Sequence, residues 1–307
     1  MNIDQVHPEL RTAIRLLPPL PFHNRFFLGS VNLFFKLIPA SLQFKGVTIR
    51  EERIGNMTVR VYTPSEGLSG AGLLWIHGGG YIMGRAAMDD PVCVDYARDL
   101  GLVVVSVEYR LAPRFPFPAA LDDCYEAWQW FLRHAPGLGV DPNRIVVAGQ
   151  SAGGGLTASL TQRIHDTDGI QPVAQVLFCP MLDDRTAANA TLDAINHRVW
   201  NNSNNRMGWS SYLGQAPGQP HVPNYAVPAR RENLTGLVPA WIGVGDIDLF
   251  HEEDYRYAER LVEQGVETHL HVAPMAPHAF ERFAPKAPIT QILMASNYRF
   301  LTAKLGL

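Results

Sequence analysis

The chain has 307 residues, of which 47% are hydrophobic and 18% are charged, an ordinary composition for a globular protein with a large buried core. Its net charge of −3 and isoelectric point near 6.4 argue against the basic surface that nucleic acids or anionic membranes select. The length is compatible with about two domains, but α/β enzymes often run longer as one. We expect a single domain over residues 1–307.

The first 45 residues carry a helical pattern that is broken by a proline-rich stretch at residues 17–21. No basic segment followed by an apolar core begins the chain, so no secretory signal is expected. The most apolar early run, residues 26–39, falls short of the ~20 apolar residues that a membrane span needs. We interpret it as an amphipathic helix packed on the protein or on a substrate pocket. A peripheral membrane contact is the less favoured alternative.

Two strands are predicted next, because residues 47–52 and 57–62 alternate in polarity on either side of a turn at Gly55 and Asn56. They would begin the sheet as an antiparallel pair. Six short apolar runs follow, each suited to a strand buried on both faces. These runs are residues 72–76, 102–107, 145–148, 173–178, 240–244 and 267–272.

Helical patterns lie between these runs, at residues 91–100, 119–134, 152–166, 252–264 and 289–304. The alternation predicts the fold class α/β, with a mostly parallel, eight-stranded sheet and helices on both faces. Residues 183–222 do not fit, because they are polar, rich in aromatic residues and poor in strand character. A stretch this long between two strands predicts an inserted cap.

Residues 149–153 have the sequence GQSAG, directly after an apolar run and at the start of a helical pattern. This context is typical of a nucleophile elbow, whose tight turn excludes side chains two residues before and after the serine. The hydroxyl of Ser151 would then lie at a helix N-terminus, where free N–H groups favour a developing oxyanion. A glycine-rich helix entry without chemistry is the less favoured alternative.

Residues 77–80 have the sequence HGGG and directly follow the predicted strand at residues 72–76. Glycines let backbone N–H groups turn toward a bound carbonyl oxygen, and a hydrolase oxyanion hole takes donors from this loop. The residue after the nucleophile supplies another donor, so we predict Gly78, Gly79 and Ala152. A phosphate-binding loop is rejected, because neither Gly-Lys-Ser/Thr nor G-x-G-x-x-G follows.

The general base must lie after the last strand, in the chain order nucleophile, acid, base. Among eleven histidines, His278 in the sequence APHAF meets both conditions. The acid should follow the penultimate strand, where Asp246 and Asp248 are two residues apart. Spacing alone does not choose between these aspartates, and either could instead cap the following helix.

The three cysteines, Cys93, Cys124 and Cys179, lie far apart in apolar stretches and form no CxxC pair. We expect them to be reduced thiols in the core of a cytoplasmic protein. None lies beside a candidate base in the sequence, which argues against a cysteine nucleophile.

Together these residues are similar to those of the hormone-sensitive-lipase family of esterases, the bacterial family IV branch of the α/β-hydrolases. The resemblance runs from about residue 45 to residue 305 and rests on five motifs in the family's order. They are HGGG at 77–80, YRLAP at 109–113 followed by FPAALDD at 117–123, GQSAGG at 149–154, DLF at 248–250 followed by Glu252 and Glu253, and PHAF at 277–280.

The resemblance implies the α/β-hydrolase fold and identifies Asp248 as the catalytic acid, because the family's acid precedes a pair such as Leu-Phe and then an acidic pair. Asp246 would be a supporting residue. Residues 1–45 and 183–222 would form a helical cap over the nucleophile.

Two positions depart from the family pattern. Gln150 stands where aspartate or glutamate is common, and Arg114 stands where glutamate is usual. These departures bear on substrate preference and local ion pairing, and they leave the expected reaction unchanged.

The expected function is that of a serine carboxylesterase that hydrolyses short- to medium-chain acyl esters through an acyl-enzyme. Ser151 would be the nucleophile, His278 the general base and Asp248 the acid that orients it. No metal or organic cofactor is expected, and the only predicted partner is the small ester, with a homodimer left open. Two alternatives stay open: an amidase or deacetylase acting on acylated amines, and a non-catalytic small-molecule receptor.

Overall fold

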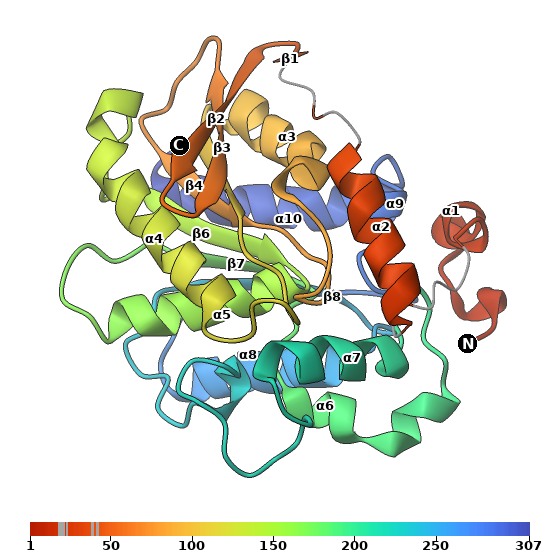
Figure 1. Ribbon diagram of the computed structural model, residues 1–307. Helices are drawn as coiled ribbons and strands as arrows, with labels where there is room; N and C mark the ends of the chain where they lie inside the picture. Colours follow the sequence, from red (N-terminus) through yellow and green to blue (C-terminus); the bar gives the residue numbers. More distant parts are fainter. Residues whose placement is uncertain (18–21, 23, 38–39, 41–42) are drawn as a thin grey trace.

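The computed structural model describes residues 1–17, 22, 24–37, 40 and 43–307, so residues 18–21 of the predicted proline-rich break lie outside the described residues. One sheet runs through the middle of the molecule, and helices cover both of its faces (Figure 1). The predicted α/β fold class, with a mostly parallel sheet, is therefore confirmed. No described helix combines the length and the hydropathy needed to cross a membrane.

The sheet has nine strands in the order β1-β2-β3-β5-β4-β6-β7-β8-β9. Strands β1 to β3 and the β3–β5 pair are antiparallel, and all pairs from β5 to β9 are parallel. The strands are β1 (Gln43–Phe44), β2 (Val47–Ile54), β3 (Met57–Pro64), β4 (Gly72–Ile76), β5 (Val103–Glu108), β6 (Ile145–Gln150), β7 (Gln175–Phe178), β8 (Ala240–Gly245) and β9 (Thr268–Ala273).

The prediction of eight strands was wrong by one short edge strand. Strand β1 has only two residues, and Gln43 and Phe44 pair with Thr48 and Val47 across a tight turn at Gly46. Two residues are too few to show an alternating pattern, and they fall within the segment that the sequence predicts to be helical. The other eight strands correspond to the eight predicted ones.

The helices also follow the predicted alternation. They are α1 (Arg11–Arg15), α2 (Arg25–Leu37), α3 (Asp90–Leu100), α4 (Ala119–His134), α5 (Ala152–His165), α6 (Asp184–Ala188), α7 (Asn202–Leu213), α8 (His251–Glu263), α9 (Phe280–Phe283) and α10 (Pro288–Leu305). Helices α4, α5 and α8 pack on one face of the sheet, and α3 and α10 on the other.

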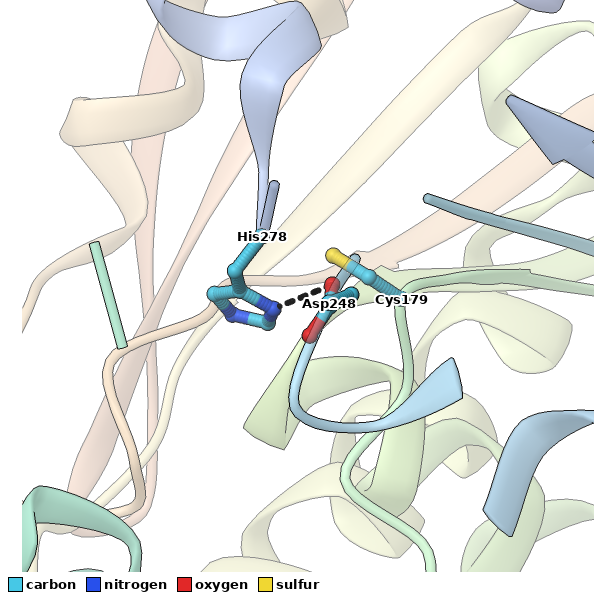
Figure 2. A group of neighbouring side chains, drawn as sticks. All are labelled: Cys179, Asp248 and His278. Atoms are coloured by element: carbon cyan, nitrogen blue, oxygen red, sulfur yellow. Dashed lines mark hydrogen bonds and ion pairs between the residues drawn. The ribbon is translucent and has the colours of Figure 1, made fainter. Parts of the chain in front are cut away.

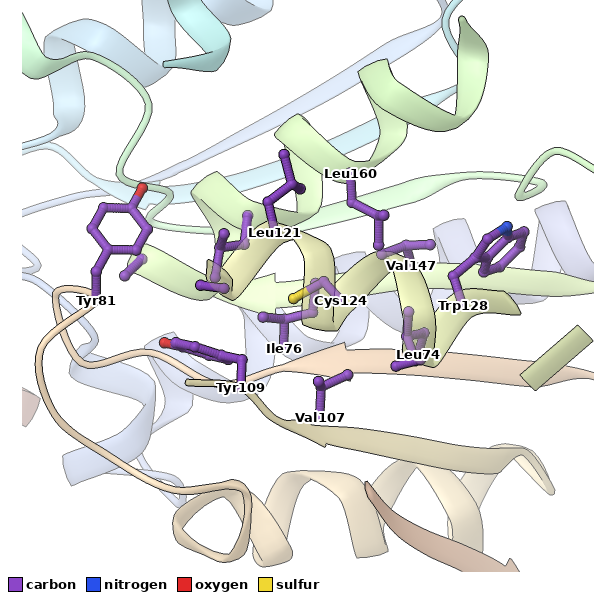
Figure 3. Close-up of a cluster of buried hydrophobic side chains, with 14 of the residues drawn as sticks. Leu74, Ile76, Tyr81, Val107, Tyr109, Leu121, Cys124, Trp128, Val147 and Leu160 are labelled. Carbon is purple, nitrogen blue, oxygen red and sulfur yellow. The ribbon is translucent and has the colours of Figure 1, made fainter. Parts of the chain in front are cut away.

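Strands β4 to β8 are buried on both faces, so each side of the sheet buries its own core. The prediction that residues 267–272 are buried on both faces was wrong, because β9 lies at the edge of the sheet and is only partly buried. On the α4 and α5 side, Leu74, Val107 and Val147 of the sheet meet Leu121 and Leu160 of the helices (Figure 3). Complete burial of such a side chain stabilises the fold by about 1.5–3 kcal/mol. Two dense cores therefore fix the strand ends on which the site is built.

The three cysteines are free and buried, as the sequence predicts for core thiols.

The two segments predicted as a cap contain short helices and touch each other. The N-terminal ammonium group donates hydrogen bonds to the carbonyl oxygens of Ile195 and Asn196, at 2.7 and 3.2 Å. The rings of Phe22 and Trp200 also meet, with centroids 6.1 Å apart. Helix α2 is tied to the main domain by Asn32, whose side-chain amide donates to the carbonyl oxygen of Ile82 at 2.9 Å.

Candidate active site

The sheet register brings the predicted site residues to one edge. Strands β4 and β6 pair Ile76 with Gly149, so the loop that begins at His77 lies beside the turn that contains Ser151. Strands β8 and β9 pair Gly245 with Ala273, and the segments carrying Asp248 and His278 leave the same edge. Because carboxyl ends of parallel strands meet at one edge, four segments distant in sequence converge there.

The turn between β6 and α5 holds Ser151 in a strained conformation, with φ 55° and ψ −119°. A β-carbon on Gly149 would lie 2.4 Å from the carbonyl oxygen of Gly153, and one on Gly153 would lie 2.0 Å from that of Ile76. Both glycines are therefore required by close backbone approach. Strain of this kind persists only where the surrounding structure fixes it, and it presents the serine at the start of α5.

A continuous line of hydrogen bonds joins the three predicted triad residues. The hydroxyl of Ser151 lies 2.9 Å from Nε2 of His278, and Nδ1 of His278 lies 2.8 Å from Oδ2 of Asp248. All three residues are buried. The carboxylate accepts the Nδ1–H proton, which leaves Nε2 as the acceptor of the serine hydroxyl.

Asp246 occupies a different position, and its carboxylate accepts the backbone N–H of Met275 at 2.5 Å. The structure therefore brings Asp248, and not Asp246, to the imidazole. Asp246 instead holds the loop on which His278 lies, because Met275 is only three residues before that histidine.

The glycine loop after β4 runs along the nucleophile turn. A β-carbon on Gly78 would lie 3.4 Å from that of Ser151, and one on Gly79, where φ is +122°, would lie 2.0 Å from the carbonyl oxygen of Met83. Within the described part of the chain, the N–H groups of Gly78 and Gly79 donate to no protein acceptor. Ala152 is the first residue of α5, and its N–H has no partner within the helix. These unpaired donors could bind an oxyanion.

His77 contacts both Tyr109 and the glycine loop. Its ring stacks on Tyr109 with centroids 4.2 Å apart, and its Nδ1 lies 2.7 Å from the carbonyl oxygen of Gly78. The hydroxyl of Tyr109 donates to the carbonyl oxygen of His77 at 3.0 Å. The stacked rings and these hydrogen bonds thus hold the loop in place.

Phe250 and Glu253 support the pair Asp248 and His278, and the sequence pattern did not predict these contacts. The N–H of Phe250 donates to Oδ1 of Asp248 at 3.0 Å, and the phenyl ring packs edge-on against the imidazole. Glu253 accepts the N–H groups of Leu182 and Asp183, which ties α8 to the loop after β7. The acidic pair that belongs to the family motif is therefore divided, since Glu252 is exposed and pairs with Arg256.

Cys179 also lies in this cluster, although it is distant in sequence (Figure 2). It follows β7, and its sulfur lies within 4.8 Å of ligand-type atoms of Asp248 and His278. This trio has the chemistry of a metal site, but both imidazole nitrogens already make hydrogen bonds. Burial also raises the pKa of the Cys179 thiol well above its usual value, which keeps it protonated and a poor ligand. The arrangement therefore fits a proton relay better than a metal centre.

The family departure at Gln150 is explained by its neighbours. Its amide donates to Glu281 at 2.5 Å and accepts from Arg282 at 3.3 Å, while Arg282 also pairs with Asp89. Burial raises the pKa of Glu281. A carboxylate at position 150 would face Glu281 with like charge, whereas the neutral amide donates a hydrogen bond to it.

The cap residues differ in their relation to the site. The ring of Trp200 lies on the glycine loop, because a β-carbon on Gly80 would be 2.4 Å from its Cη2 atom. Tyr81 stacks on Tyr212 of α7, with ring centroids 4.1 Å apart. Cap segment 183–222 thus packs directly on the loop that carries the predicted oxyanion donors.

Comparison with known proteins agrees with this geometry. A family model described as the alpha/beta hydrolase fold matches residues 73–282. The chain is 33% identical over 296 residues to esterase LipI of Mycobacterium tuberculosis, covering 94% of this chain and 85% of the relative. It is 40% identical over 166 residues to arylacetamide deacetylase of Rattus norvegicus, covering 51% of this chain and 42% of the relative.

Among solved structures, a bacterial heroin esterase superposes with a TM-score of 0.89 at 35% identity, covering 99% of both chains. Esterase LipW of Mycobacterium marinum superposes with a TM-score of 0.86 at 30% identity, covering 98% of this chain and 96% of that one. These similarities span both the sheet and the predicted cap segments. The chain therefore belongs to the hormone-sensitive-lipase branch of the α/β-hydrolase family.

Proposed function

We propose that this protein is a serine carboxylesterase that hydrolyses short- to medium-chain acyl esters. The observation that carries the proposal is the buried hydrogen-bonded line from Ser151 through His278 to Asp248, next to a loop with unpaired N–H donors. Esterases are also the named relatives that cover most of the chain.

In the acylation step, His278 takes the proton of the Ser151 hydroxyl while the serine oxygen attacks the ester carbonyl. The N–H groups of Gly78, Gly79 and Ala152 hold the developing oxyanion, and one such donor is typically worth about 3–4 kcal/mol of barrier. The imidazolium then protonates the leaving alcohol, which breaks the ester C–O bond and leaves an acyl group on Ser151.

In the deacylation step, His278 removes a proton from water, whose oxygen attacks the acyl carbonyl. The imidazolium then returns the proton to the Ser151 oxygen as the bond between serine and acyl group breaks and the acid leaves. The Asp248 carboxylate keeps the proton on Nδ1 and stabilises the imidazolium in both steps. We also propose that residues 1–307 act as one domain in the cytoplasm, with residues 1–45 and 183–222 as the cap that encloses the ester.

Replacement of Ser151 by Ala tests the assignment. We expect hydrolysis of p-nitrophenyl butyrate to fall by on the order of 10⁵-fold or more, because an alanine offers no nucleophile. The unfolding temperature should not decrease, since the substitution removes one hydroxyl from a strained turn. Wild-type turnover by the variant would contradict the proposal.

An amidase or deacetylase acting on acylated amines is the second candidate, and similarity to arylacetamide deacetylase supports it. The same residues would serve, because amine and alcohol leaving groups both take a proton from the imidazolium. Rates on an ester and an anilide with the same acyl group distinguish the two. A carboxylesterase is expected to favour the ester in kcat/KM by far more than the ratio of the uncatalysed rates.

A further inference from the structure

Helix α2 is apolar on two opposite sides. On its inner side, Leu28 is buried in the core, Val31 packs against that core, and Asn32 bonds to Ile82. On its outer side, Phe26, Leu33 and Leu37 are 91%, 58% and 71% exposed. Large apolar side chains that stay exposed along one side of a helix mark a surface that binds a partner or a membrane.

The exposed side chains form one continuous stripe along the helix. At 100° per residue, Phe26, Leu33 and Leu37 lie within about 40° of one another, and Phe34, which is 60% exposed, borders them. Phe34 therefore lies on the outer side.

The sequence around α2 has an unusual charge distribution. Residues 10–50 contain six cations and no aspartate or glutamate, whereas the remaining residues have a net charge of −9. The cations are Arg11, Arg15, Arg25, Lys36, Lys45 and Arg50. Arg15 and Lys45 have exposed side chains, while Arg50 is paired with Glu52. Residues 10–50 are therefore a basic and largely apolar segment in a chain whose net charge is −3.

We propose that the outer side of α2 binds the surface of an anionic phospholipid bilayer. An exposed apolar stripe within a sequence segment that carries cations and no acids is the combination that binds a lipid interface, where apolar side chains enter the acyl chains and cations attract the phosphates. A second copy of the chain fits less well, because a two-fold contact would set the same cations against each other.

The proposal has a consequence that rests on the proposed function. Asn32 fastens α2 to the loop after the predicted oxyanion donors, so a lipid-bound helix would hold the active site at the membrane surface. Binding itself needs no catalysis. Vesicle binding and ester hydrolysis can therefore fail independently.

Flotation of the full chain with vesicles tests the proposal. We expect binding to vesicles that contain phosphatidylglycerol in phosphatidylcholine, weaker binding to phosphatidylcholine alone, and release as salt rises. Replacement of Phe26 and Leu33 by Gln keeps a good helix former at both positions. It should weaken partitioning by on the order of tenfold or more, because two large apolar side chains are lost.

The matched control replaces Val262 and Ile292 by Gln, two apolar side chains that are each 59% exposed on other helices. This variant should bind vesicles as the wild type does, and circular dichroism should show that both variants are folded. Absence of wild-type binding to anionic vesicles would overturn the proposal, and so would equal binding by the α2 variant. A salt-insensitive dimer that only the α2 variant dissociates, without vesicle binding, would assign the stripe to self-association instead.

Discussion

The edge of the sheet and the cap are held by different kinds of contact. At the edge, backbone approaches backbone so closely that a β-carbon on Gly153 would lie 2.0 Å from a carbonyl oxygen. In the cap, aromatic rings such as those of Trp200 and Tyr212 contact the glycine loop, and the buried indole N–H groups of Trp200 and Trp209 have no partner among the described residues. Helix α2 even exposes apolar side chains.

The two regions therefore differ in how many substitutions they can accept. The proposed chemistry needs atoms placed to within a fraction of an ångström, so it depends on glycines and backbone hydrogen bonds that tolerate no substitution. Recognition of the ester, which we propose for the cap, would depend on side chains that can change in size. Substitutions at the edge should therefore abolish the rate, whereas substitutions in the cap should change selectivity.

The two aspartates at the edge of the sheet should differ strongly in their effect on the rate of hydrolysis. Replacement of Asp248 by Asn should lower kcat on p-nitrophenyl butyrate by about 10⁴-fold, because the amide no longer holds the imidazole in the productive tautomer. Replacement of Asp246 by Asn should cost less than tenfold, because that carboxylate contacts the backbone of Met275 instead. A larger loss in the Asp246 variant would reverse the assignment.

Much of the edge was predictable from the sequence, because its constraints act over short distances. A turn that excludes side chains requires glycine two residues before and after the serine, so the pattern Gly-x-Ser-x-Gly predicts Ser151 from the sequence alone. The choice between Asp246 and Asp248 is different, since spacing leaves both open and only the family resemblance separated them. The structure now brings Asp248 to the imidazole at 2.8 Å.

Other features depended on contacts between distant segments and gave no local signal. The sequence predicts Cys179 to be an ordinary core thiol, but the fold brings it close to Asp248 and His278. Strand β1 (Gln43–Phe44) is defined by its partner across a turn rather than by its own two residues. The exposure of Phe34 likewise depends on which side of α2 packs on the domain.

A smaller and more selective effect is expected in the cap. Replacement of Trp200 by Ala removes the ring that lies on Gly80, so space opens beside the glycine loop. We expect kcat/KM for p-nitrophenyl octanoate relative to butyrate to rise by about tenfold, since one or two methylenes are worth about 1–3 kcal/mol in such a pocket. Replacement of the buried Trp130 of α4 by Ala is the control for lost stability. An unchanged chain-length profile in the Trp200 variant would remove this residue from the pocket wall.

Substitution of Asp254 in α8 should affect stability more than activity. Asp254 is completely buried in α8, and neither of its carboxylate oxygens has a partner within the described residues. Burial raises its pKa well above the usual value, and the charges of Glu253 and Asp248 act in the same direction. The native state therefore favours the protonated form of this carboxyl.

The sign of the pH dependence follows from this raised pKa. Stability is fully present below the unfolded pKa of about 3.9 and is lost as the pH rises through the higher native value, because only the unfolded chain ionises freely. Replacement of Asp254 by Asn removes the titration, so the variant should become progressively more stable than the wild type as pH rises above about 4, by about 1.4 kcal/mol per pH unit until the native carboxyl ionises. Thermal unfolding between pH 4 and pH 9 measures this difference, with replacement of the exposed Glu252 by Gln as the control. A difference in stability that stays constant over this range would mean that Asp254 is ionised in the native state, which would contradict the prediction.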